Sequence, residues 1–255
     1  MLELKNISKT FNAGTVNQKV ALNGLNLTMN EGDFVTVIGG NGAGKSTMLN
    51  AIAGVFQVDT GKILIDGVDV TALPEYKRAK YIGRVFQDPM MGTAATMQIE
   101  ENLALAARRG KPRTLRPGIT KADREFYKEQ LRILDLGLED RMTTKVGLLS
   151  GGQTWQQPKL LLLDEHTAAL DPKTAAKVLE ATQRIVEKNH LTTMMITHNM
   201  RDAISYGNRL IMMYEGHVVV DVSGEEKKNL TVEQLLNLFS RASGSDEADD
   251  KLLLS

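Results

Sequence analysis

The amino-acid sequence predicts an α/β fold: a parallel-sheet core with a phosphate-binding loop, an antiparallel β subdomain and an inserted helical subdomain. Three observations support this prediction. The apolar run Phe34–Ile38 leads through a glycine-rich segment, 39–46, into a helical pattern at 47–53. A second apolar run, 160–163, ends in two carboxylates. From 97 to about 138 the apolar spacing changes to that of helices.

The length and composition suit one large α/β domain, or one such domain with an inserted lobe. The chain has 255 residues, of which 42% are apolar. Lys plus Arg and Asp plus Glu number 31 each, so no net charge attracts nucleic acid or anionic lipid. No apolar run reaches about 18 residues, and residues 1–5 lack the build of a signal peptide. The absence of cysteine excludes disulfides and Cys-ligated metals and fits a reducing compartment.

The segment 39–46 has the spacing Gly-x-x-x-x-Gly-Lys-Ser between a strand and a helix. Glycines let consecutive backbone N–H groups converge on an anion, and the helix points its positive end at the same place. Lys45 is expected to reach the terminal phosphates and the Ser46 hydroxyl to ligate Mg²⁺. A strand-to-helix turn that only packs is the alternative. We predict a nucleoside triphosphate site made by Gly39, Gly40, Asn41, Gly42, Ala43, Gly44, Lys45, Ser46 and Thr47.

The N-terminal residues predict the antiparallel β subdomain. Apolar and polar residues alternate over 2–7 and 20–29, as in strands with one solvated face. Phe11 lies in the turn between them. An aromatic side chain there either stacks on a purine ring or folds back into the local core, and the residue alone leaves both open.

Two more strands precede the helical block. Residues 62–67 form a strand-and-turn unit, and 81–86 form an apolar run that ends at Gln87. A Gln at the end of a core strand beside a phosphate site can ligate Mg²⁺ or water through its amide oxygen. A plain loop residue is the alternative reading of Gln87.

In the helical block, Ile99 and Leu103 share one predicted face, and Phe126, Ile133 and Leu134 share another. This spacing predicts a helical lobe inserted into the α/β core.

The carboxylates that follow 160–163 predict the second half of the site. Asp164 is placed to hold Mg²⁺ through a water, and Glu165 to take a proton from the attacking water. A solvated acidic turn is the alternative. His198 follows the buried run Thr192–Ile196, and strand ends of an open parallel sheet are where ligands bind. The pentapeptide 149–153 suits an anion-binding turn, but Ser-Gly-Gly also makes ordinary turns.

The last part of the chain predicts a closing hairpin and a short helix. The hairpin covers Arg209–Tyr214 and 217–221, and the amphipathic helix covers 230–239. The polar segment 244–250 is expected to be disordered.

Taken together, the segments 39–46, 149–153 and 164–165 resemble the ATP-binding cassette (ABC) transporter ATPases over roughly residues 1–240. The diagnostic feature is Leu-Ser-Gly-Gly-Gln lying between a phosphate loop and an Asp-Glu strand. The resemblance implies a RecA-like P-loop NTPase core that hydrolyses Mg²⁺-ATP. It also implies the following division: 1–87 and 158–230 as core with β subdomain, 88–157 as helical subdomain, and 241–255 as a tail.

The resemblance further implies that two cassettes, expected to be identical, meet head to tail. ATP then lies between one phosphate loop and the partner's Ser150, Gly151, Gly152 and Gln153. It implies a role for each of five more residues: adenine stacking for Phe11, Mg²⁺ coupling for Gln87, water polarisation for Glu165, a dimer contact for Asp171 and a γ-phosphate contact for His198.

Subunits of this kind dock on membrane permease subunits and act with a solute-binding protein, without nucleic acid. We therefore expect a peripheral protein at the cytoplasmic face of a bacterial membrane. His166 stands where the common pattern has Pro, which resembles a subgroup paired with lipoprotein-type binding proteins for aromatic amino acids or similar solutes. The alternatives are a cassette ATPase of the ribosome or DNA, and a subunit that binds ATP without hydrolysis.

The join 154–157 departs from the family, in which a helix of about a dozen residues follows Gln153. Twelve helical residues cover roughly 18 Å, and five extended steps from Gln153 to Pro158 cover at most about 18 Å. The ends can be bridged only by a taut chain, and a packed helix would be lost. We predict that the protein contains more residues here, with a true deletion as the alternative. An intact mass above 28.0 kDa would show the additional residues.

Overall fold

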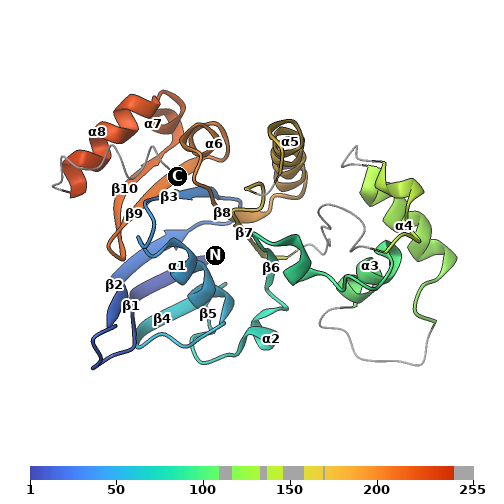
Figure 1. The fold of residues 1–255 in the computed structure, drawn as a ribbon, viewed down its shortest axis with the longest axis horizontal. Coiled ribbons are helices and arrows are strands. Elements are labelled where there is room, and N and C mark those ends of the chain that lie inside the picture. The colour runs from blue at the N-terminus through green and yellow to red at the C-terminus, as the bar shows by residue number, and fades with distance from the viewer. Residues whose placement is uncertain (109–116, 133–136, 146–157, 169, 244–255) are drawn as a thin grey trace.

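The computed structural model describes residues 1–108, 117–132, 137–145, 158–168 and 170–243. The predictions for Ser150, Gly151, Gly152 and Gln153 therefore lie outside the described residues, as do those for the join, Ile133, Leu134 and residues 244–255 of the tail. The predicted start of the tail at 241 was wrong, because a helix continues to Ser243. Two sheets with helices between and around them form the main body, and a helical region stands to one side (Figure 1).

The first sheet is the antiparallel β subdomain predicted from residues 2–29. Its four strands are ordered β2-β1-β4-β5. Their bounds are β1 Leu2–Phe11, β2 Lys19–Met29, β4 Thr60–Ile65 and β5 Val68–Asp69. Neighbouring strands pair antiparallel throughout, with Leu4 opposite Leu27 and Leu2 opposite Ile65. All four of these side chains are buried, as the alternating pattern requires.

The second sheet is the predicted parallel core, ordered β10-β9-β3-β8-β7-β6. Its strands are β3 Phe34–Ile38, β6 Ile82–Val85, β7 Leu160–Asp164, β8 Thr192–Ile196, β9 Arg209–Tyr214 and β10 His217–Ser223. Five strands run parallel, and β10 closes one edge as the predicted hairpin partner of β9. Since β8 lies between β3 and β7, the carboxyl ends of all three strands meet at one edge.

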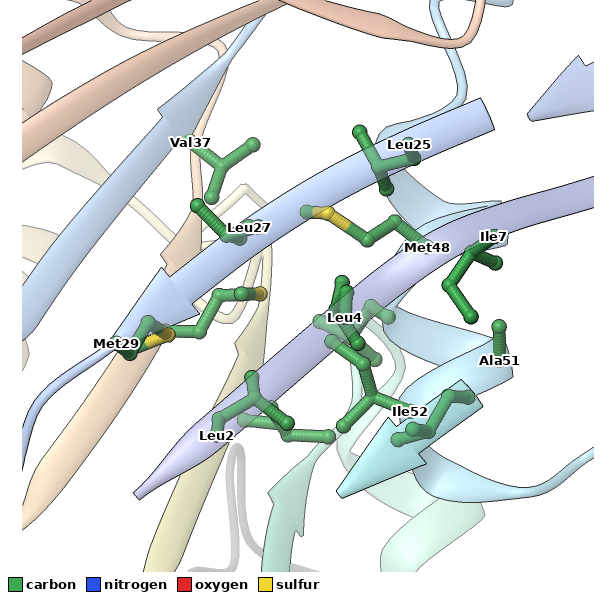
Figure 2. Packing of buried hydrophobic residues seen from close by; sticks show 14 of the residues in the cluster. Leu2, Leu4, Ile7, Leu25, Leu27, Met29, Val37, Met48, Ala51 and Ile52 are labelled. Carbon is green, nitrogen blue, oxygen red and sulfur yellow. The ribbon is translucent and has the colours of Figure 1, made fainter. Parts of the chain in front are cut away.

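Helix α1, Lys45–Ala53, lies between the two sheets and joins their cores (Figure 1). Met48, Leu49 and Ile52 are fully buried. Figure 2 shows Met48 and Ile52 beside side chains of β1 and β2. Burial of one such side chain stabilises the fold by roughly 2–3 kcal/mol. The helix that begins at the phosphate loop is therefore held by the centre of the hydrophobic core.

Among the described residues, the main body contains five further helices. They are α2 Glu75–Arg78, α5 Pro172–Asn189, α6 Met200–Ser205, α7 Gly224–Lys228 and α8 Val232–Ser243, with a short 3₁₀ turn at Pro89–Gly92. α8 confirms the amphipathic helix expected at 230–239. The long helix α5 was not anticipated, although Asp171 followed by Pro172 is a helix-start signal.

The helical block contains α3 Ile99–Ala107, α4 Lys121–Arg132 and a 3₁₀ turn at Leu138–Asp140. Ile99 and Leu103 are buried, as predicted. The prediction for Phe126 was wrong, because its side chain is 55% exposed and the buried face of α4 carries Tyr127 and Leu131. One helical residue turns the face by about 100°, so the spacing gave a face that is one position out of register.

An ion pair of 2.6 Å between Arg124 and Glu100 ties α4 to α3. The boundary of the helical subdomain at residues 88 and 157 stays a prediction. In the described part of the chain, no helix is both long and apolar enough to cross a membrane.

Candidate nucleotide-binding and catalytic site

The carboxyl edge of the parallel sheet gathers the predicted site. The loop 39–44 follows β3, Glu165 follows β7 and His198 follows β8. Asp164, the last residue of β7, pairs with Ile196, the last residue of β8. Residues separated by more than a hundred positions therefore meet because the strands lie side by side in parallel.

The phosphate loop has a backbone conformation that only glycine can adopt at two of its positions. Gly39 has φ 148°, and a Cβ there would stand 2.3 Å from the Met213 carbonyl oxygen. Gly44 has φ 102°, and a Cβ there would stand 2.6 Å from the Ala21 carbonyl oxygen. Both backbone conformations and both close approaches exclude larger side chains.

The Lys45 side chain folds back over this loop. Its ammonium donates to the carbonyl oxygens of Gly39 at 2.6 Å and Gly40 at 3.1 Å, and the residue is 5% exposed. Burial lowers the pKa of Lys45, while the negative charges of Glu165 and Asp164 oppose that shift. The loop, its lysine and the two carboxylates thus lie within electrostatic reach of one another.

The open side of the loop fits a chain of phosphates. A Cβ built on Gly40 would meet nothing within 4 Å, and Asn41, Gly42 and Ser46 are exposed. Here α1 presents its first free N–H groups. Of the other predicted loop residues, Ala43 and Gly44 are buried and Thr47 is half-buried, so they shape the turn from inside.

Glu165 and His198 form a direct contact. His198 Nε2 lies 2.6 Å from Glu165 Oε1. Glu165 has a left-handed backbone, with φ 46°, and its N–H donates to the Ile196 carbonyl oxygen at 3.1 Å. A neutral histidine that donates from Nε2 to one carboxylate oxygen leaves the other oxygen free to accept from water. The structure therefore brings the two predicted residues together in an orientation suited to general-base chemistry.

A cavity of about 680 Å³ between α5 and α6 reaches this pair. Both Glu165 and His198 line it, together with apolar side chains of the two helices that include Leu179 and Met200. The Glu165–His198 pair is thus accessible from this cavity.

The predicted metal ligands also suit their ion. Ser46 offers a hydroxyl at the start of α1, and Asp164 offers a carboxylate at the end of β7. The described residues hold no group of three or more His, Cys, Asp and Glu placed to bind a metal by themselves. Mg²⁺ is commonly held by one or two protein oxygens together with substrate phosphates, so these residues fit the cation in the presence of nucleotide.

Gln87 lies beyond the end of β6 and is exposed. Because Val85 pairs with Leu163, Gln87 reaches the same edge of the sheet as Glu165. This places Gln87 beside the site, and its role as a metal ligand stays a prediction.

Phe11 ends β1 and packs edge-on against Phe56, with ring centroids 5.3 Å apart. The Phe11 side chain is half-buried. Of the two predicted positions, it therefore occupies the one folded back onto the local core. Phe11 also pairs with Lys19 across the ladder, and Lys19 Nζ lies 3.2 Å from the position of a Cβ on Gly42. This end of β1 and β2 therefore overlies the phosphate loop, and adenine stacking by Phe11 stays a prediction.

Asp171 is exposed and caps α5, where its carboxylate accepts from the Thr174 N–H at 3.1 Å. This hydrogen bonding lowers the pKa of the Asp171 carboxyl. The capping role needs no second subunit, so the predicted dimer contact rests on the resemblance alone.

His166 is 7% exposed, and its Nε2 lies 3.5 Å from the Thr182 hydroxyl oxygen. Burial lowers the pKa of His166 to about 4, so the side chain is neutral at pH 7. His166, which departs from the family pattern, is therefore a buried residue that packs the turn after β7 against α5.

Asp164 also makes a polar contact with Arg84, which the sequence pattern did not predict. Arg84 Nη2 donates to Asp164 Oδ2 at 3.2 Å and to Asn50 Oδ1 at 2.6 Å. The available signal was a single arginine inside the otherwise apolar run 81–86, because a charge in a buried strand needs a partner.

Comparisons with known proteins agree with this geometry. The sequence profile of the family described as "ABC transporter" matches residues 22–168. The chain is 43% identical over 251 residues to a tyrosine transport ATP-binding protein of Clostridioides difficile, covering 95% of this chain and 100% of the relative. It is 32% identical to a phosphonates import ATP-binding protein, PhnC, of Lactobacillus johnsonii, covering 97% and 100%.

Among solved structures, the ATP-binding cassette MJ0796, a dimer in a post-hydrolysis state bound to ADP and Pi, superposes with a TM-score of 0.73 at 30% identity. The match covers 88% of this chain and 98% of that one. The ADP conformation of the cassette MJ1267 superposes with a TM-score of 0.75 at 27% identity, covering 94% and 98%.

Proposed function

The chain belongs to the ABC transporter family as an ATP-hydrolysing, nucleotide-binding subunit, and we propose that it powers the uptake of a small solute, an aromatic amino acid such as tyrosine. The fold class and the enzyme class predicted from the sequence are thereby confirmed. The observation that carries the catalytic part is the 2.6 Å contact between Glu165 and His198 beside the phosphate loop.

We assign the chemistry to the residues of this edge as follows. Lys45 and the N–H groups of the loop bind the phosphates of ATP, and Ser46 and Asp164 hold Mg²⁺. Bound Mg²⁺ would neutralise charge on the phosphate oxygens. Glu165 accepts a proton from the attacking water, while His198 holds the Glu165 carboxylate and faces the γ-phosphate.

We propose that two copies of the chain form the active unit. The related cassette MJ0796 is described as a dimer. The predicted second half of the nucleotide site, Ser150, Gly151, Gly152 and Gln153, lies outside the described residues. Size-exclusion chromatography of Glu165→Gln with Mg²⁺-ATP is expected to show a dimer, because ATP holds the subunits together when it is not cleaved. A Glu165→Gln protein that binds ATP and elutes as a monomer would contradict the dimer.

The proposed solute rests on the relative from Clostridioides difficile, which is named for tyrosine transport and aligns over its full length. A second relative named for phosphonate import is less similar, at 32% identity. Both names favour transport over the alternative of a ribosome- or DNA-associated ATPase. Such a role requires membrane permease subunits and a position at the cytoplasmic face of the membrane, which we include in the proposal.

Uptake in cells tests the solute. Deleting the gene is expected to slow the uptake of radiolabelled tyrosine. The wild-type gene should restore uptake, and the Glu165→Gln gene, expressed at the same level, should not. Unchanged tyrosine uptake after deletion, together with ATP hydrolysis by the purified protein, would overturn the solute and leave the enzyme class intact.

A further inference from the structure

Arg84 makes a set of contacts that the family assignment does not explain. Its side chain is 11% exposed, and that of Asp164 is 14% exposed. Arg84 Nη2 contacts Asp164 Oδ2 at 3.2 Å and Asn50 Oδ1 at 2.6 Å. The guanidinium carbon also lies 4.4 Å from the centroid of the Phe86 ring. A nearly buried cation is thus shared between a carboxylate, an amide and an aromatic face.

This arrangement is poorly explained by stability alone. Burying a charge is unfavourable unless its hydrogen-bonding groups are paired, and replacing a buried ion pair by apolar side chains is often neutral or stabilising. Arg84 Nε is buried and has no hydrogen-bond partner among the described residues. Arginine commonly binds a carboxylate through two nitrogens. Here Arg84 contacts Asp164 through Nη2 and Oδ2, which leaves Oδ1 of the carboxylate available to another ligand.

The partners of Arg84 lie on the two elements that carry the proposed metal ligands. Asn50 is four residues after Ser46 on α1, so the two side chains share one face of that helix. Asp164 ends β7. The chain of contacts from Asn50 through Arg84 to Asp164 therefore links the helix that bears Ser46 to the strand that bears the carboxylate.

We propose that Arg84 is a positioning residue of the ATPase: it fixes the Asp164 carboxylate, relative to Ser46, in the orientation that Mg²⁺ requires. The proposal rests on the proposed role of Asp164 in metal binding. Residues that orient metal ligands typically change metal affinity by roughly 10- to 100-fold when they are replaced. Arg84 does not touch the nucleotide in this assignment, so metal-free ATP binding does not depend on it.

The test measures Mg²⁺ dependence of nucleotide binding rather than turnover. A fluorescent ATP analogue is bound to the purified protein in EDTA and then with increasing Mg²⁺. For Arg84→Met we expect the Mg²⁺ concentration at half-effect to rise about tenfold. The affinity in EDTA should stay within about twofold of the wild type, because Lys45 and the loop are unchanged. An unchanged Mg²⁺ midpoint, or an equal loss of affinity with and without Mg²⁺, would overturn the proposal.

Arg78→Met is the matched control, because it removes another buried arginine by the same substitution. Arg78 donates to backbone carbonyl oxygens of Ala51, Ile52, Leu73 and Thr71. It should lower stability and leave the Mg²⁺ midpoint unchanged. A shift as large as that of Arg84→Met would assign the effect to general destabilisation.

Two milder variants decide the matter if Arg84→Met does not fold. Asn50→Ala removes one anchor of the guanidinium and should raise the Mg²⁺ midpoint by about threefold. Arg84→Lys keeps the charge, but a single ammonium replaces the planar fork, so it should shift the midpoint less than Arg84→Met. If both folded variants keep the wild-type midpoint, Arg84 does not position Asp164.

Asp164→Asn separates this proposal from the proposed function. If Asp164→Asn raises the Mg²⁺ midpoint and Arg84→Met does not, the role of Asp164 stands and that of Arg84 fails. If Asp164→Asn has no effect, the metal assignment itself fails. The double variant should be no worse than Asp164→Asn alone, because Arg84 acts through that carboxylate. If the shifts of the Mg²⁺ midpoint in the two single variants multiply in the double variant, Arg84 acts independently of Asp164.

Discussion

The two ends of α1 differ in whether a side chain of the protein caps them. At the N-terminal end, Gly44 caps the helix without a side-chain hydrogen bond, and Ser46 is exposed. At the C-terminal end, the Arg78 guanidinium covers the last turn and donates to Ala51 O at 2.7 Å and Ile52 O at 2.9 Å. Arg78 is 1% exposed. One end is left open for an anion, and the other is closed by a cation of the chain itself.

The difference shows that burial of a cation does not identify a binding site. Lys45 and Arg78 are both buried and both donate to backbone carbonyl oxygens. Burial lowers the pKa of Arg78, and Asp69 opposes that shift. Of these two cations, Lys45 alone lies near Glu165 and Asp164 at the sheet edge. It also lies at the N-terminal end of α1, where no side chain caps the first N–H groups. Unsatisfied donors, together with opposite charge nearby, distinguish a ligand site from an internal cap.

Removing the cation at the open end is expected to have the largest effect. Lys45→Ala loses two charge-assisted contacts with phosphate, at roughly 2 kcal/mol each. ATP affinity should therefore fall by about 1000-fold, and hydrolysis should disappear with it. Isothermal titration with ATP measures this, and circular dichroism checks the fold. Lys77→Ala, an exposed lysine near the closed end, is the control. Tight ATP binding by Lys45→Ala would mean that the loop does not hold phosphate.

Replacing Glu165 separates binding from chemistry at the open end. Glu165→Gln keeps the size and the contact with His198 but cannot take a proton. We expect ATP affinity within about twofold of the wild type and turnover lower by at least about 100-fold. A steady-state phosphate-release assay gives the rate. Asp202→Asn, a carboxylate on α6 that lines the adjoining cavity, is the control and should hydrolyse ATP normally. Wild-type turnover by Glu165→Gln would remove Glu165 from its catalytic role.

Removing the cation at the closed end should cost stability and spare binding. Arg78→Met leaves several carbonyl oxygens without a partner, so the free energy of unfolding should fall by about 3 kcal/mol. Urea unfolding measures this loss. Lys77→Met is the matched control and should change stability by less than about 0.5 kcal/mol. The folded Arg78→Met protein should bind ATP as the wild type does, and a large loss of affinity would show that the two ends are coupled.

A third buried cation, Lys227 on α7, predicts a smaller effect that depends on pH. Its ammonium donates to the carbonyl oxygens of Tyr206 and Gly207, next to the end of α6, and it is 2% exposed. Burial lowers the pKa of Lys227 from 10.5 to about 8. Between these two pH values the unfolded chain holds a proton that the native state has released. The free energy of unfolding should therefore rise with pH in this window.

The comparison with Lys227→Met separates the contribution of Lys227 to the pH dependence of stability from that of other titrating groups. The difference in unfolding free energy between wild type and Lys227→Met should grow by about 1 kcal/mol from pH 7 to pH 9. Denaturation at several pH values measures it. The exposed neighbour Lys228 provides the control substitution, Lys228→Met, which should show no such slope relative to wild type. A flat difference for Lys227→Met would mean that Lys227 stays charged in the native state.

The sequence by itself determined the parts of this protein that are local in the chain. Strand, glycine-rich loop and helix follow one another from Phe34 to Ala53, so their pattern and spacing are enough to predict a phosphate site. The buried run ending in Asp164 and Glu165 is equally local. Alternating residues likewise predicted the antiparallel strands, because a strand with one solvated face has a period of two.

Only the tertiary structure decided which distant residues touch. The insertion of β8 between β3 and β7 brings His198 onto Glu165, and strand order is not encoded in any short segment. The rotation of α4 decided that Tyr127, not Phe126, is buried. Arg84 finds Asn50 and Asp164 across three elements that are adjacent only after folding. Local patterns specify which element forms, whereas a side chain's partner depends on how the elements pack.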